Sequence, residues 1–343
     1  MDARTLPRQA IRAARREAHG LARRARTEAD WRRSRSARAD VAVFHEFAPP
    51  PSGGGHQFLR ALERELATRG LDLEENRISG STPVCLFNSF NFDFGRLRRF
   101  ARSDCRMVHR VDGPIGAYRG FDDGTDRRIA EINAELADAT VFQSQYSLEK
   151  HLELGIELRE PVIISNTVDP AVFHRSSLRD PVHGRRVRVI ATSWSSNPRK
   201  GGDVFSWLDQ HLDPDRYEMT FVGQTAQRFE RIRHVGPVDS HEVAEFLRAH
   251  DIYVAASRDD PCSNALLEAL ACGLPAAYLD SGGHPELVGE GGLPFVSEEQ
   301  LPAVLGRLSE DLDSYRARIS IPSIASVADR YLAVLGLMPH ARP

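Results

Sequence analysis

One carboxylate interrupts an otherwise apolar helix in the last third of the chain. Residues 265–272 read ALLEALAC, in which Glu268 is the only charged side chain. Ser263 or Asn264 can cap the start of this helix, and Gly273 suits the left-handed position just past its end. Because a helix that is apolar all round is buried, Glu268 is predicted to place a carboxylate inside the protein. An unpaired buried carboxylate is costly, so Glu268 needs either an arginine partner or a ligand such as the vicinal hydroxyls of a ribose.

A glycine turn follows this helix. Residues 276–279 (AAYL) are predicted to form a short buried strand, and residues 281–283 (SGG) a tight turn. Pro285 then suits the first position of a second helix. The free N–H groups at such a helix start favour an anion such as a phosphate, although glycine turns also serve merely to reverse the chain.

The whole stretch resembles the nucleotide-sugar motif of the family-4 retaining glycosyltransferases, which have the GT-B fold. In that family two acidic residues are separated by seven others. A helix ending in Gly-x-Pro, a Gly-Gly pair and a Glu then follow. The matching residues of this chain are Asp260, Glu268, Gly273, Pro275, Gly282, Gly283 and Glu286.

The resemblance implies a role for each acidic residue. Asp260 would contact the donor sugar near its reacting face, and Glu268 would hold the ribose. The first acid of the family is usually Glu, so Asp260 is a departure that is one methylene shorter. The other donor contacts that this stretch implies are Ser263, Asn264, Gly282, Gly283 and His284.

Two neighbouring cations precede this motif. The loop 193–202 contains Arg199 and Lys200, and the chain has only one other lysine, Lys150. The family places a Lys-Gly here with an Arg six residues earlier, and both cations clamp the diphosphate. Lys200 matches that lysine, whereas the arginine position falls on Trp194. The resemblance implies that Lys200 stabilises charge on the leaving diphosphate. Arg199 would supply the second cation, or it is an ordinary exposed loop cation.

A second glycine loop lies near the start of the chain. A predicted strand at 40–45 leads into SGGG at 52–55 and an amphipathic helix at about 57–68, which is typical of a doubly wound α/β domain. The spacing is neither GxGxxG nor that of a P-loop, which disfavours both kinds of site. In the family such a loop lies near the diphosphate, which implies Gly54 and Gly55 as donor contacts.

Polar residues also follow a predicted strand at 106–109. Family members often carry a histidine in this region that meets the donor sugar, and either His109 or Asp112 holds that place by offset. For His109 the alternative is a histidine satisfied within the core. Further along, residues 235–238 (VGPV) resemble the base-contacting loop of the family, which implies Gly236 as a donor contact.

Strands and helices alternate along both halves of the chain, which predicts two doubly wound, Rossmann-like α/β domains that face a cleft. Residues 39–175 are assigned to an N-terminal, acceptor-side domain and 176–324 to a C-terminal, nucleotide-sugar-binding domain. The resemblance implies that a last helix, at about 325–338, packs back on the first domain. Further strands are predicted at 84–88, 139–143, 162–165, 188–191, 217–223 and 252–255.

The composition is that of a soluble globular chain, with 41% apolar and 27% charged residues among 343. The sequence lacks a run of 18 apolar residues and begins with a charged segment, so neither a transmembrane helix nor a secretory signal is predicted. The four cysteines have no CxxC spacing, which predicts a cytoplasmic protein without a zinc site or a disulfide framework.

The first 38 residues form a basic arm. They hold 12 arginines and four acidic residues, a net charge of +8 in a chain whose total is −3. Two interpretations stay open: a solvated tail, or an arm that leans on anionic headgroups at the inner membrane face. No aromatic interleaving or motif supports binding to nucleic acid.

The resemblance therefore implies a retaining glycosyltransferase of the hexosyltransferase class. It would move a sugar from a nucleotide-diphospho-sugar to a glycan, lipid-linked or small-molecule acceptor in cell-envelope glycan or glycoconjugate synthesis. No cofactor or metal is expected, because Lys200 and helix N-termini take the place of a metal ion. Two alternatives stay open. One is a catalytically weak nucleotide-sugar-binding protein, which the departures at Asp260 and Trp194 favour. The other is a different GT-B enzyme, such as a nucleotide-sugar epimerase.

Overall fold

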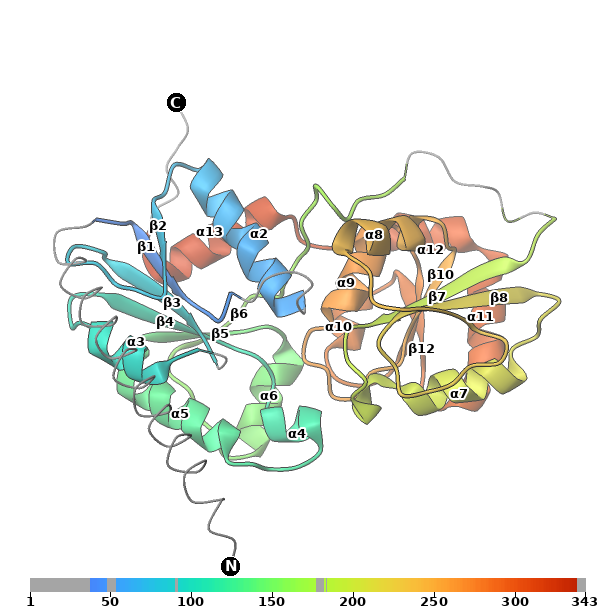
Figure 1. Cartoon of the computed structure of the whole chain (residues 1–343), viewed down its shortest axis with the longest axis horizontal. Coiled ribbons are helices and arrows are strands. Elements are labelled where there is room, and N and C mark those ends of the chain that lie inside the picture. The colour runs from blue at the N-terminus through green and yellow to red at the C-terminus, as the bar shows by residue number, and fades with distance from the viewer. Residues whose placement is uncertain (1–37, 48–53, 90–91, 177–181, 183, 338–343) are drawn as a thin grey trace, which may run out of the picture.

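The computed structural model describes residues 38–47, 54–89, 92–176, 182 and 184–337. The basic arm, apart from residue 38, therefore lies outside the described residues, as do most of the loop before Gly54 and part of the segment that joins the domains. The described residues form two domains, each built on a sheet of six parallel strands (Figure 1). The predicted pair of doubly wound α/β domains is confirmed.

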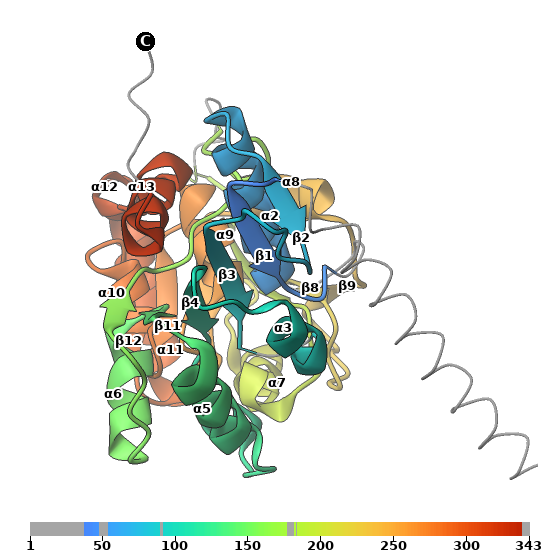
Figure 2. The ribbon, with the colours of Figure 1, turned by 90° about the vertical axis from the view of Figure 1, so that its left-hand side faces the viewer.

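Helices cover both faces of the first sheet, whose strand order is β2-β1-β3-β4-β5-β6. Its central strands are buried along their whole length, because alternate side chains face opposite helix layers. Figure 2 shows α2 and α13 above the strands and α3, α5 and α6 below them. The strands are β1 (Val41–Phe44), β2 (Leu73–Glu75), β3 (Val84–Asn88), β4 (Arg106–Val111), β5 (Ala139–Phe142) and β6 (Pro161–Ile163), and the helices of this half are α2 (Gly54–Thr68), α3 (Phe94–Phe100), α4 (Ile115–Arg119), α5 (Thr125–Leu136) and α6 (Gln145–Glu153).

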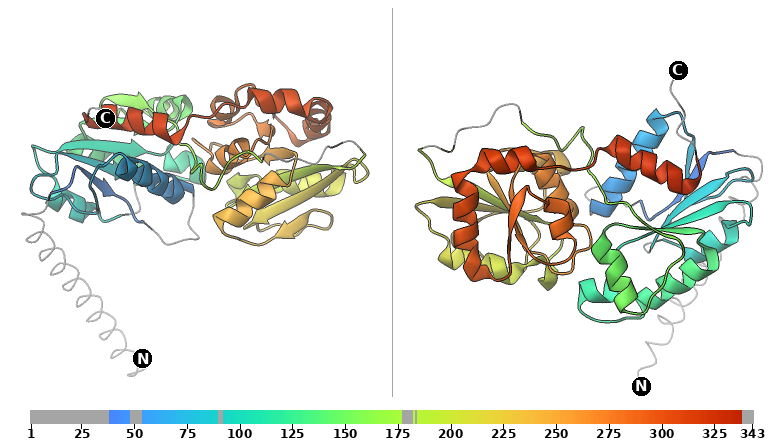
Figure 3. Two further views of the ribbon diagram at one scale, coloured as in Figure 1. Left: turned by 90° about the horizontal axis from the view of Figure 1, so that it is seen from above. Right: turned by 180° about the vertical axis from the view of Figure 1, so that it is seen from behind.

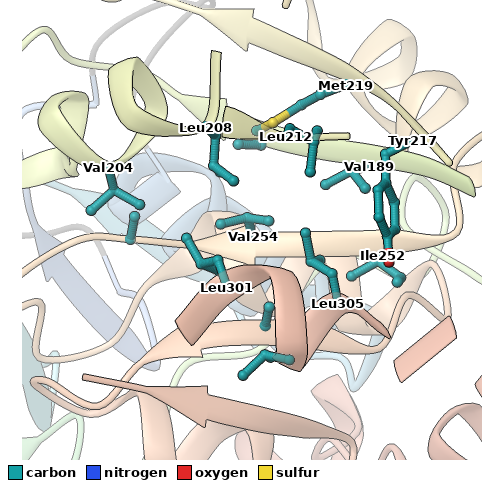
Figure 4. Close-up of a cluster of buried hydrophobic side chains, with 14 of the residues drawn as sticks. Val189, Val204, Leu208, Leu212, Tyr217, Met219, Ile252, Val254, Leu301 and Leu305 are labelled. Carbon is teal, nitrogen blue, oxygen red and sulfur yellow. The ribbon is translucent and has the colours of Figure 1, made fainter. Parts of the chain in front are cut away.

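The second sheet has the order β12-β11-β10-β7-β8-β9. One face packs in a core that includes Val189, Val254 and Leu305 (Figure 4), and the other packs against the apolar side of α9. Its strands are β7 (Val187–Ser193), β8 (Tyr217–Gly223), β9 (Arg233–Val235), β10 (Ile252–Ala255), β11 (Ala276–Leu279) and β12 (Gly292–Phe295), and its helices are α7 (Gly202–His211), α8 (Ser240–Arg248), α9 (Asn264–Ala271), α10 (His284–Val288), α11 (Leu301–Glu310) and α12 (Leu312–Arg318).

The last helix, α13 (Ile324–Leu335), lies on the first domain although it follows the second in sequence. It packs beside α2 (Figures 1 and 3). Its buried face includes Val327, Tyr331 and Leu335. Arg106 at the start of β4 donates a hydrogen bond of 2.8 Å to the carbonyl oxygen of Val334. The two domains are thus joined by the segment between β6 and β7 and by the segment that leads into α13.

Each sheet has a point where the strand order changes direction, between β1 and β3 in the first and between β7 and β10 in the second. Loops that leave the carboxyl ends of such strands diverge and open a crevice, where doubly wound proteins bind ligands. The loop with Lys200 follows β7 and the loop with Asp260 follows β10. Among the described helices, none combines the length and the apolar character needed to cross a membrane.

Candidate active site

A cavity of about 460 Å³ lies between the two domains, at the carboxyl ends of both sheets. Its first wall comes from residues at the ends of β1, β3, β4 and β5 and from the start of α2. Its second wall comes from the ends of β7, β8 and β10, from the start of α8 and from α9. The sequence-predicted residues that line the cavity are Gly55, Asp112, Lys200, Asp260, Ser263, Asn264 and Glu268.

Glu268 carries its carboxylate to this cavity from the middle of α9. Ser263 is the N-cap residue of the helix, but its side chain accepts no capping hydrogen bond. Gly273 has the predicted left-handed conformation, with φ of 80°. Within the described part of the chain, Glu268 has no hydrogen-bond or ion-pair partner, so the arginine pair considered from the sequence is not formed there. Burial without a compensating charge raises the pKa of the Glu268 carboxyl to about 8.

Lys200 and Asp260 form an ion pair across the switch point of the second sheet, with 2.7 Å from Nζ to Oδ2. Burial favours the neutral form of both groups, but the opposite charge of the partner outweighs it. The pKa of Lys200 is therefore raised and that of Asp260 lowered. Asp260 is only 5% exposed, and the Cys262 N–H donates to its other carboxylate oxygen at 3.3 Å. The pair fixes the position of the Lys200 ammonium at the wall of the cavity.

The glycine turn packs against the backbone of Asp260, and its residues are not among those described as lining the cavity. The Gly283 N–H donates to the Asp260 carbonyl at 2.9 Å, and a Cβ on Gly282 would collide with that same carbonyl oxygen. His284 is fully buried, with 3.0 Å between its Nε2 and the Ser257 hydroxyl. The helix that the turn feeds, α10, has only five residues. Gly282, Gly283 and His284, predicted as donor contacts, thus lie against the Asp260 loop and outside the described lining of the cavity.

Gly282 offers a test of this contact with the Asp260 loop. Its φ of 64° and its contact with the Asp260 backbone leave no room for a side chain. Gly282→Ala is expected to destabilise the protein by about 1–3 kcal/mol, seen as a lower midpoint of urea unfolding. Gly306→Ala is the matched control, because Gly306 lies inside α11 with open space around it and should gain about 0.5–1 kcal/mol. Equal midpoints for the two variants would contradict the assignment.

Of the two candidates near β4, the structure brings Asp112 to the cavity and leaves His109 in the core. The Asp112 carboxylate accepts hydrogen bonds from Gln143 and, at 3.3 Å, from Ser89. His109 is 0% exposed and stacks on Phe87 with ring centroids 4.3 Å apart. Burial lowers the pKa of His109 to about 3. Because side chains alternate along a strand, His109 faces the helix layer below the sheet, which corresponds to the core-histidine interpretation.

Two other predicted contacts, Arg199 and Gly236, are not among the described residues that line the cavity. Arg199 pairs with Asp259 and does not line the cavity. Gly236 is also absent from the described lining, although its neighbour Pro237 belongs to it, and Gly54 directly precedes the lining residue Gly55. Trp194, which holds the family's arginine position, does line the cavity and is 38% exposed.

Sequence reasoning missed a polar network on the first wall. Arg110, only 1% exposed, donates at 2.7 Å to Asn88 and at 2.8 Å to Asn166. Asn166 in turn donates at 3.0 Å to Asn264 of the second domain. Asn88 ends a predicted strand, and Asn166 follows another, so their positions at strand ends were the available signal.

A histidine pair was also missed. His45 and His56 lie on the same wall, with 2.8 Å between Nε2 of the first and Nδ1 of the second. Burial, followed by the nearby His56 and Arg110, lowers the pKa of His45 to about 3. His45 directly follows β1, so its place at a strand end was again the available signal.

Residues 203–311 match the model of the family "Glycosyl transferases group 1", a segment that contains Asp260 and Glu268 but not Lys200. A search of curated protein sequences finds no match. Sucrose-phosphate synthase from Thermosynechococcus elongatus superposes with a TM-score of 0.64 at 15% identity, over 87% of this chain and 94% of that one. For WaaG, a glycosyltransferase involved in lipopolysaccharide biosynthesis, the TM-score is 0.61 at 14% identity, over 86% and 99%. The chain has the GT-B fold.

Another GT-B structure, Anabaena HepE in complex with UDP-glucose, has a TM-score of 0.59 at 16% identity and covers 86% of this chain and 95% of its own. At these identities the likeness concerns the fold. It confirms the GT-B architecture that the motif around Asp260 and Glu268 predicted, with the cavity between the two Rossmann-like domains.

Proposed function

We propose that this GT-B protein is a retaining, metal-independent glycosyltransferase that moves a sugar from a nucleotide-diphospho-sugar to an acceptor. The observation that carries the proposal is the pairing, in one cavity, of two features. Glu268 is an unpartnered carboxylate that fits a ribose, and Lys200, held by Asp260, is a fixed cation that fits a diphosphate. The match of residues 203–311 to glycosyl transferases group 1 supports it.

In this scheme the second domain binds the donor. Ribose hydroxyls donate to the Glu268 carboxylate, which removes the cost of leaving it unpaired. The diphosphate lies at Lys200, and Asp260 and Asp112 reach the sugar from opposite walls. Two neighbours support a nucleotide-sugar donor, because one was solved with UDP-glucose and another, the catalytic domain of Arabidopsis starch synthase IV, with ADP and acarbose.

The first domain then presents the acceptor. Its wall offers Asp112, His45, His56 and Arg110, which are polar groups suited to an acceptor that carries hydroxyls. We assign the acceptor to the glycans or glycoconjugates of the cell envelope, a class that the likeness to WaaG supports.

The proposed reaction is a front-face displacement. The bond between the anomeric carbon and the phosphate oxygen breaks, and a bond to the acceptor oxygen forms on the same face of the sugar. The acceptor proton passes to an oxygen of the leaving diphosphate. Negative charge grows on that diphosphate during the step, and the Lys200 ammonium stabilises it without having to reorganise.

A thermal-shift screen against UDP-, GDP- and ADP-sugars tests donor binding, and release of free nucleotide tests turnover. One nucleotide class should raise the melting temperature, because a ligand at 100 times its Kd adds about 2.7 kcal/mol to the stability of the folded state. Nucleotide release should proceed unchanged in excess EDTA. Binding with no turnover on any acceptor would favour the nucleotide-sugar-binding alternative, and an epimerised donor would favour an epimerase.

A further inference from the structure

We propose that Tyr118 is a positioning residue, which holds the Lys200 ammonium in place from the opposite domain. The Lys200 Nζ lies 5.0 Å from the centroid of the Tyr118 ring, and both residues line the cavity. Lys200 belongs to the second domain and Tyr118 to α4 of the first. The inference rests on the proposed role of Lys200 at the leaving diphosphate.

Tyr118 is carried by a segment that is itself tied down. The Asp126 carboxylate at the start of α5 accepts hydrogen bonds from the N–H groups of Ile115 and Gly116, at 2.7 and 2.8 Å. A Cβ on Gly116 would lie 3.2 Å from that carboxylate, so the approach is close. The short helix α4 ends at Gly120, which has φ of 82°. The ring is therefore presented by a fixed turn of the first domain and not by a free loop.

The contact between the domains is built around the same place. A Cβ on Gly113 would lie 2.8 Å from Cβ of Pro261, so this glycine lets the Asp260 loop approach the first domain. The Glu286 carboxylate accepts the N–H groups of Gln145 and Tyr146 at the start of α6, both at 2.7 Å. These contacts hold the second domain against the first and so keep Tyr118 beside Lys200.

The Tyr118 ring matters because the lysine side chain is flexible. An ammonium on a flexible four-carbon stem has three donors and no preferred direction of its own. Asp260 takes one donor, and the ring face of Tyr118 attracts the same cation from another side. The remaining donors are left for a phosphate oxygen. Asp260 and Tyr118 both raise the pKa of Lys200, which keeps the group charged.

The kinetic test compares Tyr118→Leu, which removes the ring, with Tyr118→Phe, which keeps it. The Leu variant should lower kcat for donor turnover by roughly 2- to 30-fold, the range of a cation–π contact, with a smaller change in the donor KM. The Phe variant keeps the ring but loses the hydroxyl contact with Lys200, so its kcat should lie between those of the wild type and the Leu variant. Equal kcat for the wild type and the Leu variant would overturn the inference.

A second measurement tests whether the Tyr118 ring lies beside the Lys200 ammonium, and it does not depend on enzymatic turnover. Labelling with ¹⁵N-lysine gives only two side-chain ammonium signals, from Lys150 and Lys200. The ring current of Tyr118 should displace the Lys200 signal in the wild type and in the Phe variant, and Tyr118→Leu should abolish the displacement. Lys150 on α6, 2.6 Å from Glu153, is the internal control and should not move.

The two measurements separate the inference from the proposed function. A wild type that turns over no nucleotide-sugar contradicts the function, and the ammonium spectrum then still decides whether Tyr118 positions Lys200. A Lys200 signal that is the same in the wild type and the Leu variant overturns the inference even if the enzyme is active. A displaced signal together with a lower kcat supports both.

Discussion

Replacing Lys200 with alanine is expected to lower kcat for donor turnover by about 10²–10³-fold, the usual loss when one preorganised donor to a developing charge is removed. The donor KM should rise much less. The reason is that negative charge on the diphosphate grows as the bond to the anomeric carbon breaks, so Lys200 contributes more in the transition state than in the bound donor. Steady-state kinetics with the donor found by the thermal screen gives both constants.

One control variant and one stability measurement make this result specific. Lys150→Ala removes the only other lysine, which lies on the surface of α6, and should leave kcat unchanged. Lys200→Ala also leaves the buried Asp260 unpaired, which destabilises the fold, so urea unfolding of the same variant is measured to separate stability from catalysis. A higher KM with an unchanged kcat would make Lys200 a ground-state binder and end its leaving-group role.

The long elements of this fold were predictable because their patterns are unambiguous. The run VCLFN, for example, is the buried strand β3 at the predicted residues, and the amphipathic pattern at 57–68 lies within α2. The short edge strands β2, β9 and β12 were not predicted. Each has three or four residues and lies at or near a sheet edge, so pairing with a neighbour defines it more than its own sequence does.

The candidate site likewise contains residues that a local sequence signal predicted and residues that only the structure revealed. Glu268 was found because one carboxylate among apolar residues is a local signal, and Asp260 because the spacing of the two acids is also local. The choice between His109 and Asp112 depended on which side of β4 each side chain faces, and only the packing of His109 on Phe87 decides it. Tyr118 had no local signal at all, because its significance lies in a contact with the other domain.

The departure at Asp260 has a physical consequence that the sequence alone did not reveal. The carboxylate forms a 2.7 Å ion pair with Lys200, so in the empty cavity the two residues neutralise each other. Asp260 takes one of the three ammonium donors, so a donor diphosphate would share the Lys200 ammonium with Asp260. The paired arrangement keeps Lys200 charged and placed before the donor arrives, and the neighbouring Arg199 is paired with Asp259 in the same way.

Glu268→Gln should weaken donor binding but raise the stability of the protein measured without donor. Above pH 8, where the Glu268 carboxyl is ionised, donor affinity should fall by roughly 1.5–3 kcal/mol, because a hydrogen bond to a charged acceptor becomes one to a neutral amide. Calorimetry measures this loss. In the wild type, donor affinity should also rise as the pH approaches about 8, since the ionised carboxylate accepts the ribose hydroxyls, whereas the Gln variant should show no such rise.

In the absence of donor, the Glu268→Gln substitution should stabilise the protein at high pH. Folding raises the pKa of the Glu268 carboxyl from 4.5 to about 8, so the unfolded chain releases this proton at lower pH than the folded protein does. The stability of the wild type therefore falls as the pH rises through that window, and Gln, which cannot ionise, escapes the loss. The melting temperature of Glu268→Gln should exceed that of the wild type above pH 8 and equal it below pH 4.5. Glu310→Gln, at an exposed position on α11, is the matched control and should follow the wild type at every pH. Equal melting curves for Glu268→Gln and the wild type above pH 8 would mean that the carboxylate has a partner in solution, and the ribose assignment would lose its main support.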